Sequence, residues 1–283
     1  MTELQILNDI AALRAWREEV AARNLRVGLV PTMGNLHAGH ISLVHAAKAE
    51  CDVVLATIFV NPLQFGANED LDRYPRTFEA DCKALQEAGA NAVFAPEPSE
   101  LYPRGLGAQT RISVPGLSEL HCGKTRPGHF DGVCTVVTKL FNLTQAHDAY
   151  FGLKDYQQFR IISTMVEDLN LPIRLHGVPT VRGIDGLALS SRNGYLSPEQ
   201  RELAPHLYRV LQLTGARVSG GATDLRALER EAVEALKTAG FRPDYVAICD
   251  AETLLPAEDD TDSIILLGAA WLGETRLIDN VLL

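Results

Sequence analysis

The stretch VGLVPTMGNLHAGHISLVHAA, residues 27–47, decides the fold because it joins an apolar run to an amphipathic one. The run Val27–Val30 is typical of a buried strand, and the turn residues that begin at Pro31 end it. The spacing of apolar residues over 41–50 predicts a helix, which we expect to begin around Gly39. A strand that leads through a tight turn into a helix is the repeating unit of parallel α/β sheets.

The same alternation of strand and helix patterns continues to about residue 180. Apolar runs of strand length predict strands at Val27–Val30, Val53–Val60, Ala92–Ala95, Ala149–Gly152 and Ile173–Val178. Amphipathic stretches predict helices at 41–50, 78–88, 133–143 and 156–169. Their order predicts an α/β domain over residues 1–180, built as a Rossmann-like, doubly wound parallel sheet.

Beyond Arg182 the pattern changes to a polar, Gly-rich stretch, followed by two helical patterns and three strands. The strands are expected near 245–249, 263–267 and 276–282. This order predicts a second, smaller α+β domain over residues 181–283. The sequence SPEQ at 197–200 has the spacing of a capping box with proline in the first helical position, so a helix is expected to begin there.

Composition and charge exclude several classes of protein. The chain has 283 residues, of which 46% are apolar and 22% charged, as in ordinary globular proteins. Lys and Arg number 26 against 36 Asp and Glu, and the net charge of −10 argues against nucleic-acid and membrane partners. The N-terminal residues lack a signal-peptide pattern, and the five cysteines are odd in number and widely spaced. We therefore expect a cytoplasmic protein with reduced thiols.

His37 and His40 are three residues apart at the expected helix start, so both imidazoles lie on one side of its first turn. Backbone N–H groups there have no intrahelical acceptor, and such helix starts bind anions. The pattern predicts a site for a phosphate chain, which Gly34 and Gly39 would let the backbone approach. The alternative is that both histidines are ordinary polar residues of a loop. His45, farther along, is expected to be structural.

The sequence PTMGNLHAGH at 31–40 resembles the ATP-binding signature of the pantothenate synthetase family, within the nucleotidyltransferase-like α/β superfamily. Four later stretches are similar to further blocks of this family, in the same order. They are TIFVNPLQFG at 57–66, RPGHFDGVCTVVTKLFN at 126–142, GLKDYQQ at 152–158 and DGLALSSRN at 185–193. Several blocks in order are far more specific than the H-x-G-H pattern, which other adenylyl-transferring enzymes share.

The resemblance implies an ATP- and Mg²⁺-dependent ligase of pantothenate biosynthesis, in the coenzyme A pathway. Such an enzyme joins (R)-pantoate to β-alanine through a pantoyl adenylate and releases AMP and pyrophosphate. The family likeness also implies a homodimer and a reaction cleft between the two domains. Two rival functions are an adenylyltransferase, whose site would need more positive charge for a second phosphate, and a nucleotide-sensing module without catalysis.

Resemblance also assigns roles to matched positions. The catalytic set is His37, His40, Lys154 and Arg192. The ATP-binding set is Pro31, Thr32, Met33, Gly34, Asn35, Leu36, His37, Ala38, Gly39, His40, Gly152, Leu153, Lys154, Asp155, Val181, Leu189, Ser190, Ser191 and Arg192. The pantoate-binding set is Asn61, Gln64 and Gln158. The family usually has Glu or Gln at Leu153 and Met at Leu189. The metal ligands are unknown.

Several of these positions also have local interpretations. Gln64 lies in a turn-rich stretch and could face water, and Asp155 and Gln158 have the spacing of a capping box. Asp81 matches an acidic position near the family's magnesium, yet solvent-facing carboxylates are common on helices. NEDLDRY at 68–74 is either a solvated charged loop or a lid. His40 could donate a proton to the phosphates or could stay neutral and only hydrogen-bond them, because a helix N-terminus disfavours imidazolium.

Overall fold

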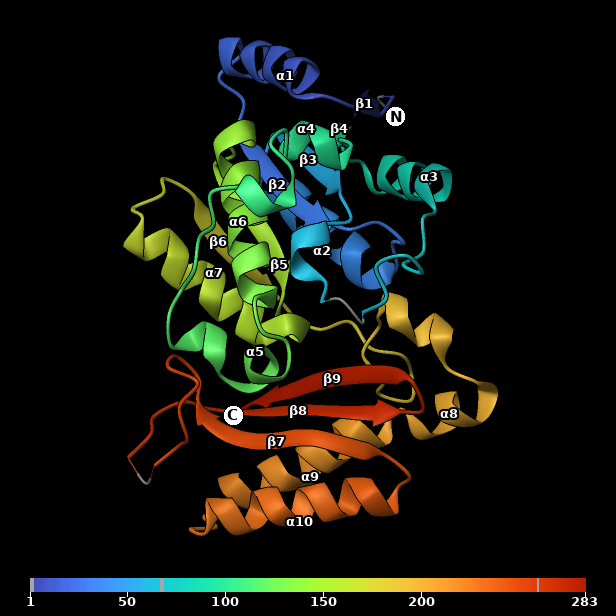
Figure 1. The fold of residues 1–283 in the computed structure, drawn as a ribbon, viewed down its shortest axis with the longest axis vertical. Coiled ribbons are helices and arrows are strands. Elements are labelled where there is room, and N and C mark those ends of the chain that lie inside the picture. The colour runs from blue at the N-terminus through green and yellow to red at the C-terminus, as the bar shows by residue number, and fades with distance from the viewer. Residues whose placement is uncertain (1–2, 67–68, 259) are drawn as a thin grey trace. The chain divides into compact units, whose positions relative to one another are not determined.

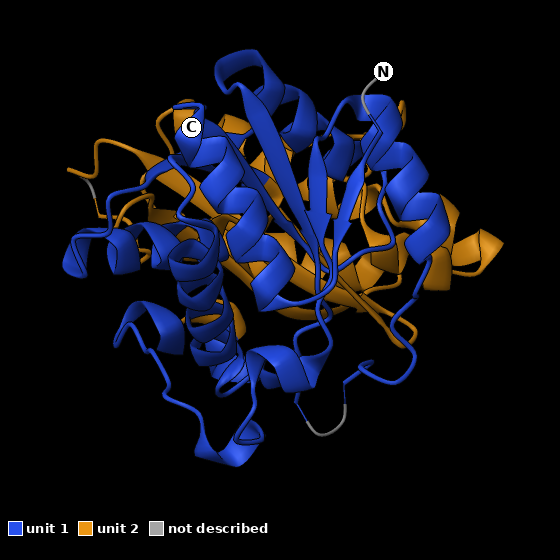
Figure 2. Ribbon diagram, turned by 90° about the horizontal axis from the view of Figure 1, so that it is seen from above, with its two compact units in different colours: residues 1–119, 123–153, 158–179 blue, residues 120–122, 154–157, 180–283 orange. Residues whose placement is uncertain are grey.

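The computed structural model describes residues 3–66, 69–258 and 260–283. Within it the chain divides into two compact units (Figure 2). The first unit comprises residues 1–119, 123–153 and 158–179, and the second comprises residues 120–122, 154–157 and 180–283. The expected second domain is 181–283, so the two short early segments, 120–122 and 154–157, are a difference from that expectation.

The first unit is built on a six-stranded sheet in the order β1-β4-β3-β2-β5-β6, and every pairing is parallel (Figure 1). The strands are β1 Gln5–Leu7, β2 Val27–Thr32, β3 Val53–Ile58, β4 Ala92–Phe94, β5 Asp148–Gly152 and β6 Arg174–Val178. This confirms the predicted doubly wound α/β fold. Strand β1 was not predicted, because it has only three residues and a single buried side chain.

The helices of the first part of the chain follow the predicted alternation. They are α1 Ile10–Ala22, α2 Ala38–Glu50, α3 Phe78–Ala88, α4 Pro98–Leu101, α5 His121–Thr125, α6 His129–Thr144 and α7 Tyr156–Asp168. Short 3-10 turns occur at η1 Pro62–Gln64, η2 Leu106–Ala108, η3 Leu117–Glu119 and η4 Leu153–Asp155. Helices α1, α4 and α5 were not predicted, and α6 begins four residues before the expected start at 133, since its first turn holds a single large apolar residue, Phe130, and shows no apolar period.

The apolar residues of the strands explain why helices cover both faces of the sheet. Leu29 and Val30 point to opposite faces of β2, and both are 0% exposed. Val30 belongs to a core cluster that includes Val44 of α2 and Leu85 of α3. Helix α6 is buried along most of its length and contacts both β2 and α1.

The order of the strands locates the place where such folds bind ligands. From β2 the chain moves outward through β3 and β4, and it then returns to the other side of β2 to form β5 and β6. The carboxyl ends of β2 and β5, at Thr32 and Gly152, therefore flank a topological switch point. Ligands of open α/β sheets bind at this position. The motif that follows β2 is the one that the sequence analysis assigns to ATP.

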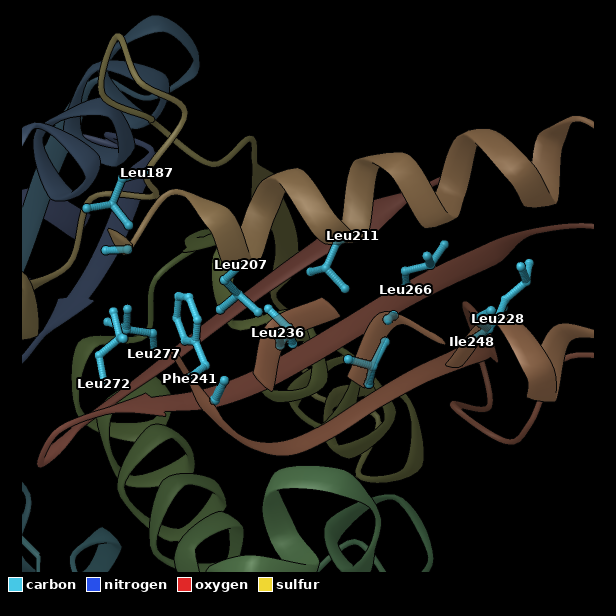
Figure 3. Close-up of a cluster of buried hydrophobic side chains, with 14 of the residues drawn as sticks. Leu187, Leu207, Leu211, Leu228, Leu236, Phe241, Ile248, Leu266, Leu272 and Leu277 are labelled. Carbon is cyan, nitrogen blue, oxygen red and sulfur yellow. The ribbon is translucent and has the colours of Figure 1, made fainter. Parts of the chain in front are cut away.

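The second unit contains an antiparallel sheet in the order β7-β8-β9 and a layer of helices. Its elements are η5 Ser191–Tyr195, α8 Pro198–Leu203, α9 His206–Ser219, α10 Leu225–Thr238, β7 Arg242–Asp250, β8 Ile264–Leu272 and β9 Thr275–Leu282. Figure 3 shows the buried cluster between helices and sheet, with Leu211 from α9, Leu236 from α10 and Leu266 from β8. This confirms the smaller α+β domain type.

Helix α8 begins with the capping box that the sequence predicts. The Ser197 side chain accepts the N–H of Gln200, whose own side chain receives the Ser197 N–H. In the described residues after 180, three α-helices replace the two expected, because a break at Pro205 separates α8 from α9. Within the described part of the chain, no helix has the length and apolar character required to cross a bilayer.

Candidate active site

The turn after β2 has a specific backbone conformation. Thr32 anchors it, since its hydroxyl donates to the Thr57 carbonyl at 2.5 Å and receives the Gly34 N–H at 3.2 Å. Gly34 and Asn35 then adopt left-handed conformations, with φ of +82° and +49°. Glycine tolerates this region without strain, and asparagine tolerates it better than most residues. The turn brings the chain from the end of β2 to the start of α2.

Asp81 of α3 holds this turn from the side. Its two carboxylate oxygens accept the backbone N–H of Asn35 at 2.9 Å and that of Leu36 at 2.8 Å. The Thr77 hydroxyl also donates to it, at 3.1 Å. Asp81 is 3% exposed, so the solvent-facing interpretation is wrong. Charge-assisted hydrogen bonds of this kind are stronger than neutral ones, and they fix the path of the loop.

The two histidines cap helix α2. His37 is the N-cap residue, and its Nδ1 accepts the N–H of Gly39 at 3.1 Å. The Nδ1 of His40 accepts the His37 N–H at 3.4 Å, and the ring centroids are 4.1 Å apart. Two N–H groups at this helix start, which lack intrahelical carbonyl acceptors, therefore bond to imidazole nitrogens instead. A side chain at Gly39 would lie 2.9 Å from the His37 ring, which explains the glycine.

This capping geometry assigns the tautomers of the two imidazoles. An Nδ1 atom that accepts an N–H carries no proton, so in the neutral ring the proton resides on Nε2. His37 and His40 are therefore suited to donate Nε2–H hydrogen bonds to an anion.

Gln64 connects the predicted pantoate-binding stretch at 57–66 to the predicted ATP-binding stretch at 31–40. It ends η1 and is 9% exposed, so it does not simply face water. Its Nε2 atom lies 2.9 Å from the Met33 sulfur, and its Oε1 accepts the Asn61 side-chain N–H at 3.1 Å. The structure thus places a residue assigned to pantoate directly beside a residue assigned to ATP.

Asn61 is 1% exposed, and both ends of its amide have protein partners. The Nδ2 atom also donates to the Gly132 carbonyl at 3.0 Å. The Oδ1 atom accepts the Leu63 N–H at 3.3 Å and the Tyr102 hydroxyl at 2.8 Å. This arrangement favours a positioning role for Asn61 over direct contact with substrate.

Helix α6 and Arg126, which precedes it, pack against the loop that contains Leu63 and Gln64. A methyl group at Gly132 would lie 2.4 Å from the Leu63 carbonyl oxygen, so only glycine fits there. The Gln64 carbonyl accepts from His129 Nδ1 at 2.7 Å, and Arg126 NH1 lies 3.0 Å from His129 Nε2. Arg126 also forms a two-pronged ion pair with Glu69, at 2.7 and 2.6 Å.

Part of the predicted charged loop at 68–74 is packed. Asn68 lies outside the described residues. Burial opposes ionisation of Glu69, but the hydrogen bonds and charge of Arg126 outweigh it and lower the pKa of this carboxylate. Tyr74 is 5% exposed and meets Phe65 edge to face. The solvated-loop interpretation is wrong for these two side chains, whereas the lid stays a prediction.

Strand β5 leads into the stretch GLKDYQQ at 152–158, to which the resemblance assigns ATP and pantoate contacts. Leu153 packs against β6, because a methyl group added at Gly177 would lie 2.6 Å from the Leu153 side chain, and an apolar residue suits this contact. Lys154 follows, with its Nζ 3.9 Å from Asp155 Oδ2 and its carbonyl bonded to Asn280. Gln158 is partly buried on α7. The Asp155–Gln158 capping box stays a prediction.

In the second unit, a short hairpin carries the predicted phosphate loop. Leu189 donates its N–H to the Val181 carbonyl at 3.0 Å, and Ser190 caps η5 by accepting the Arg192 N–H at 3.3 Å. Arg182 fixes the hairpin through two 2.7 Å bonds to Asp279 of β9. Ser191 and Arg192 are partly buried and lie within this braced turn. The ordinary-turn interpretation therefore accounts for Ser190 locally.

Sequence reasoning missed two supporting residues and misjudged a third. Tyr102 and Gly132 were not singled out, and Asp81 was considered only for a metal or for solvent. Gly132 lay within a quoted block, which was the available signal. Among the described residues, no group of three or more His, Cys, Asp and Glu side chains is arranged to hold a metal ion. Both Asp81 oxygens already accept backbone N–H groups.

The fold and this geometry define the class of protein. A doubly wound parallel sheet carries a histidine-capped helix at its switch point, as in Rossmann-like nucleotide-binding proteins. The family model described as pantoate-beta-alanine ligase matches residues 5–282, and the chain belongs to this family.

Curated relatives and solved structures agree with this assignment. The chain is 56% identical to a pantothenate synthetase of Azotobacter vinelandii over 275 residues, 97% of each chain. Its structure resembles the pantothenate synthetase of Thermus thermophilus with a TM-score of 0.90, at 49% identity, over 98% of this chain and 99% of that one. The Francisella tularensis pantoate-beta-alanine ligase, complexed with β,γ-ATP and β-alanine, has a TM-score of 0.81 at 33% identity, over 99% and 97% of the chains.

Proposed function

We propose that this chain condenses (R)-pantoate with β-alanine, with conversion of ATP to AMP and pyrophosphate. The family assignment over nearly the whole chain supports this activity. The ATP and β-alanine named for the Francisella tularensis relative support the same two ligands here. The observation that carries the proposal is the contact between Gln64 and Met33, which joins the predicted pantoate loop to the predicted ATP loop.

In the first step, a pantoate carboxylate oxygen attacks the α-phosphorus of ATP, and the bond to the bridging oxygen of pyrophosphate breaks. Negative charge moves onto the leaving pyrophosphate. His37 and His40, which cap the helix through Nδ1, would direct Nε2–H donors at these oxygens. Because Asp81 fixes the loop before α2, these donors are positioned before the reaction begins.

In the second step, the β-alanine amine attacks the carbonyl carbon of pantoyl adenylate. The amide bond forms, AMP leaves with the electron pair of the broken acyl–oxygen bond, and the amine loses a proton. Gln64 would hold pantoate through both steps, with Gln158 as a further contact. Asn61 is assigned the positioning of Gln64 and not a substrate contact, because both ends of its amide are already hydrogen-bonded.

The family resemblance supports phosphate-binding roles for Lys154 and Arg192. The Lys154 side chain is 18% exposed, and its 3.9 Å distance to Asp155 leaves a weak ion pair that phosphate could replace. Arg192 stands in a turn that Ser190 and the Arg182–Asp279 pair hold in shape. A guanidinium in a braced turn can bind phosphate oxygens with two parallel hydrogen bonds.

Magnesium is proposed to enter as its complex with ATP. Mg²⁺ in such sites keeps several waters and is held mainly by substrate phosphates with one or two carboxylates. The described residues form no protein cage for it, and Asp81 is engaged with backbone N–H groups. We assign no side chain as its ligand. Bound to the phosphates, the ion would neutralise part of their charge.

A homodimer in the cytoplasm is also proposed, on the family resemblance alone. Sedimentation equilibrium of the full chain would test the dimer.

Identification of the products tests the proposed activity. The purified chain is mixed with ATP, Mg²⁺, (R)-pantoate and β-alanine, and the products are identified by mass spectrometry. Pantothenate, AMP and pyrophosphate in equal amounts are expected. Release of ADP, or of a dinucleotide, would overturn the proposal, and omission of either organic substrate should abolish the amide product.

A further inference from the structure

Tyr102 contacts the loop that carries Asn61 and Gln64, and its hydroxyl is hydrogen-bonded to the Asn61 side chain. It follows helix α4 directly, is 2% exposed and donates to Asn61 Oδ1 at 2.8 Å. Its ring lies 6.0 Å from that of Phe59, and the Lys139 amine lies 5.8 Å from it. Burial raises the pKa of the Tyr102 phenol well above its ordinary value, so the group remains a hydrogen-bond donor.

The contacts of Asn61 fix the direction of its amide. A backbone carbonyl can only accept, so the 3.0 Å contact with Gly132 identifies Nδ2 as the atom on that side. The Leu63 N–H and the Tyr102 hydroxyl both donate to the opposite atom, Oδ1. The bond to Leu63, at 3.3 Å, is the longer of these two.

The direction of Asn61 sets that of Gln64. The second proton of Asn61 Nδ2 points at Gln64 Oε1, at 3.1 Å, so Oε1 is the accepting end of that amide. Gln64 consequently turns Nε2, a donor, toward Met33. If Asn61 were reversed, Gln64 would have to present its carbonyl instead.

We propose that Tyr102 is a positioning residue for pantoate recognition: through Asn61, it makes Gln64 present an N–H donor, and not a carbonyl, to the substrate. The inference rests on the proposed function, in which Gln64 binds pantoate. Pantoate offers carboxylate and hydroxyl oxygens, which accept hydrogen bonds, and an N–H donor suits them where a carbonyl would repel the carboxylate. Tyr102 itself does not touch the substrate.

The test measures binding and uses a double-mutant cycle. Calorimetry determines the Kd of (R)-pantoate, with a non-hydrolysable ATP analogue present, for the full-length wild type, Tyr102→Phe, Gln64→Ala and the double variant. Tyr102→Phe keeps the ring and removes only the hydroxyl. We expect it to weaken pantoate binding about tenfold, the scale of one buried hydrogen bond, while the Kd of the ATP analogue stays unchanged.

Coupling separates positioning from a general structural effect. If Tyr102 acts through Gln64, Tyr102→Phe changes pantoate binding little once Gln64 is alanine. Equal effects in both backgrounds would overturn the inference, as would an unchanged pantoate Kd in Tyr102→Phe. The matched control is Tyr150→Phe, which removes another buried tyrosine hydroxyl, 3.6 Å from the Cys51 sulfur, and should leave pantoate binding unchanged.

A second variant reverses the amide polarity directly. Asn61→Asp replaces the donor Nδ2 by an acceptor, so Gln64 must turn its N–H toward Asp and its carbonyl toward the substrate. Pantoate binding should fall more than in Tyr102→Phe, and wild-type affinity would contradict the inference. A wild type that binds the ATP analogue but not pantoate would overturn the proposed function itself, and that result is obtained before any variant is measured.

Discussion

The Nδ1 atom of His40 faces the backbone N–H of His37 at 3.4 Å, and the Nδ1 of His37 accepts the N–H of Gly39 at 3.1 Å. Each imidazole therefore has two separate roles: Nδ1 caps the helix, and Nε2 carries the proton. Two roles for the His40 Nε2–H stay predictions: complete proton donation to the phosphates, and a hydrogen bond from a ring that stays neutral, because a helix N-terminus disfavours imidazolium.

Substitution of His40 should separate these roles. His40→Ala is expected to fold and to lose roughly 10² or more in turnover, the usual scale for a lost transition-state donor. His40→Asn can replace the capping atom but not the distant donor, so it should be as inactive as alanine. His40→Gln restores an N–H near the Nε2 position and should recover part of the rate. Steady-state kinetics provides the measurement.

The control for these variants is His45→Ala, which changes an exposed histidine farther along α2. It should leave turnover near the wild-type value. Near wild-type turnover in a folded His40→Ala protein would contradict a catalytic role for His40. Equal inactivity of His40→Asn and His40→Gln would favour proton donation over hydrogen bonding.

Asp81→Asn should weaken ATP binding without changing the Mg²⁺ requirement. An amide can accept only one of the N–H groups of Asn35 and Leu36, and its NH₂ would face the other donor. The Kd of an ATP analogue without metal should rise about tenfold, equivalent to about 1.4 kcal/mol. Glu79→Gln, on the exposed part of the same helix, is the control. Unaltered metal-free binding, together with a raised Mg²⁺ requirement, would make Asp81 a metal ligand after all.

Gly132→Ala should destabilise the chain and displace the loop that contains Leu63 and Gln64. The new methyl group would lie 2.4 Å from the Leu63 carbonyl oxygen, and backbone atoms must move to admit it. A loss of about 1–3 kcal/mol in the free energy of unfolding is expected, measured by urea denaturation. Gly107→Ala is the control, because a methyl group there has no neighbour within 4 Å. Equal stability of the two variants would refute the close approach.

The Arg126–Glu69 pair should contribute to stability only above acidic pH. Arg126 lowers the pKa of Glu69 below its ordinary 4.5 despite the burial of the carboxylate, so the unfolded chain binds the proton more readily. The contribution is complete above that ordinary value and is lost as pH falls through the lowered pKa. Urea midpoints of wild type and Glu69→Gln should differ at about pH 7 and converge as the pH falls through the lowered pKa of Glu69. A constant difference would exclude this linkage.

Local patterns predicted the main elements because each of them has a regular apolar face. Helix α3 occupies the expected residues 78–88, and the α8 capping box was visible within four residues of sequence. Strand β1 escaped prediction because its stability comes from pairing with β4, 87 positions away at Gln5↔Ala92, and not from an apolar run of its own.

The supporting contacts of the site could not be predicted, because they join residues that are distant in sequence. Tyr102 and Asn61 are 41 positions apart, and Leu36 and Asp81 are 45 apart. A hydrogen bond between such residues leaves no periodic signal in either segment. Motif residues such as His37, His40 and Gln64 were identified by pattern and resemblance, whereas the residues that orient them emerged only from the fold.

Exchange of labelled pyrophosphate into ATP tests the central claim, that the chain forms pantoyl adenylate before the amine reacts. The chain is incubated with ATP, Mg²⁺, labelled pyrophosphate and (R)-pantoate, without β-alanine. We expect label in ATP, because bound pyrophosphate can attack the adenylate in reverse, and Lys154→Ala should suppress the exchange. Exchange that requires β-alanine would contradict an adenylate formed first, and exchange without pantoate would contradict the substrate.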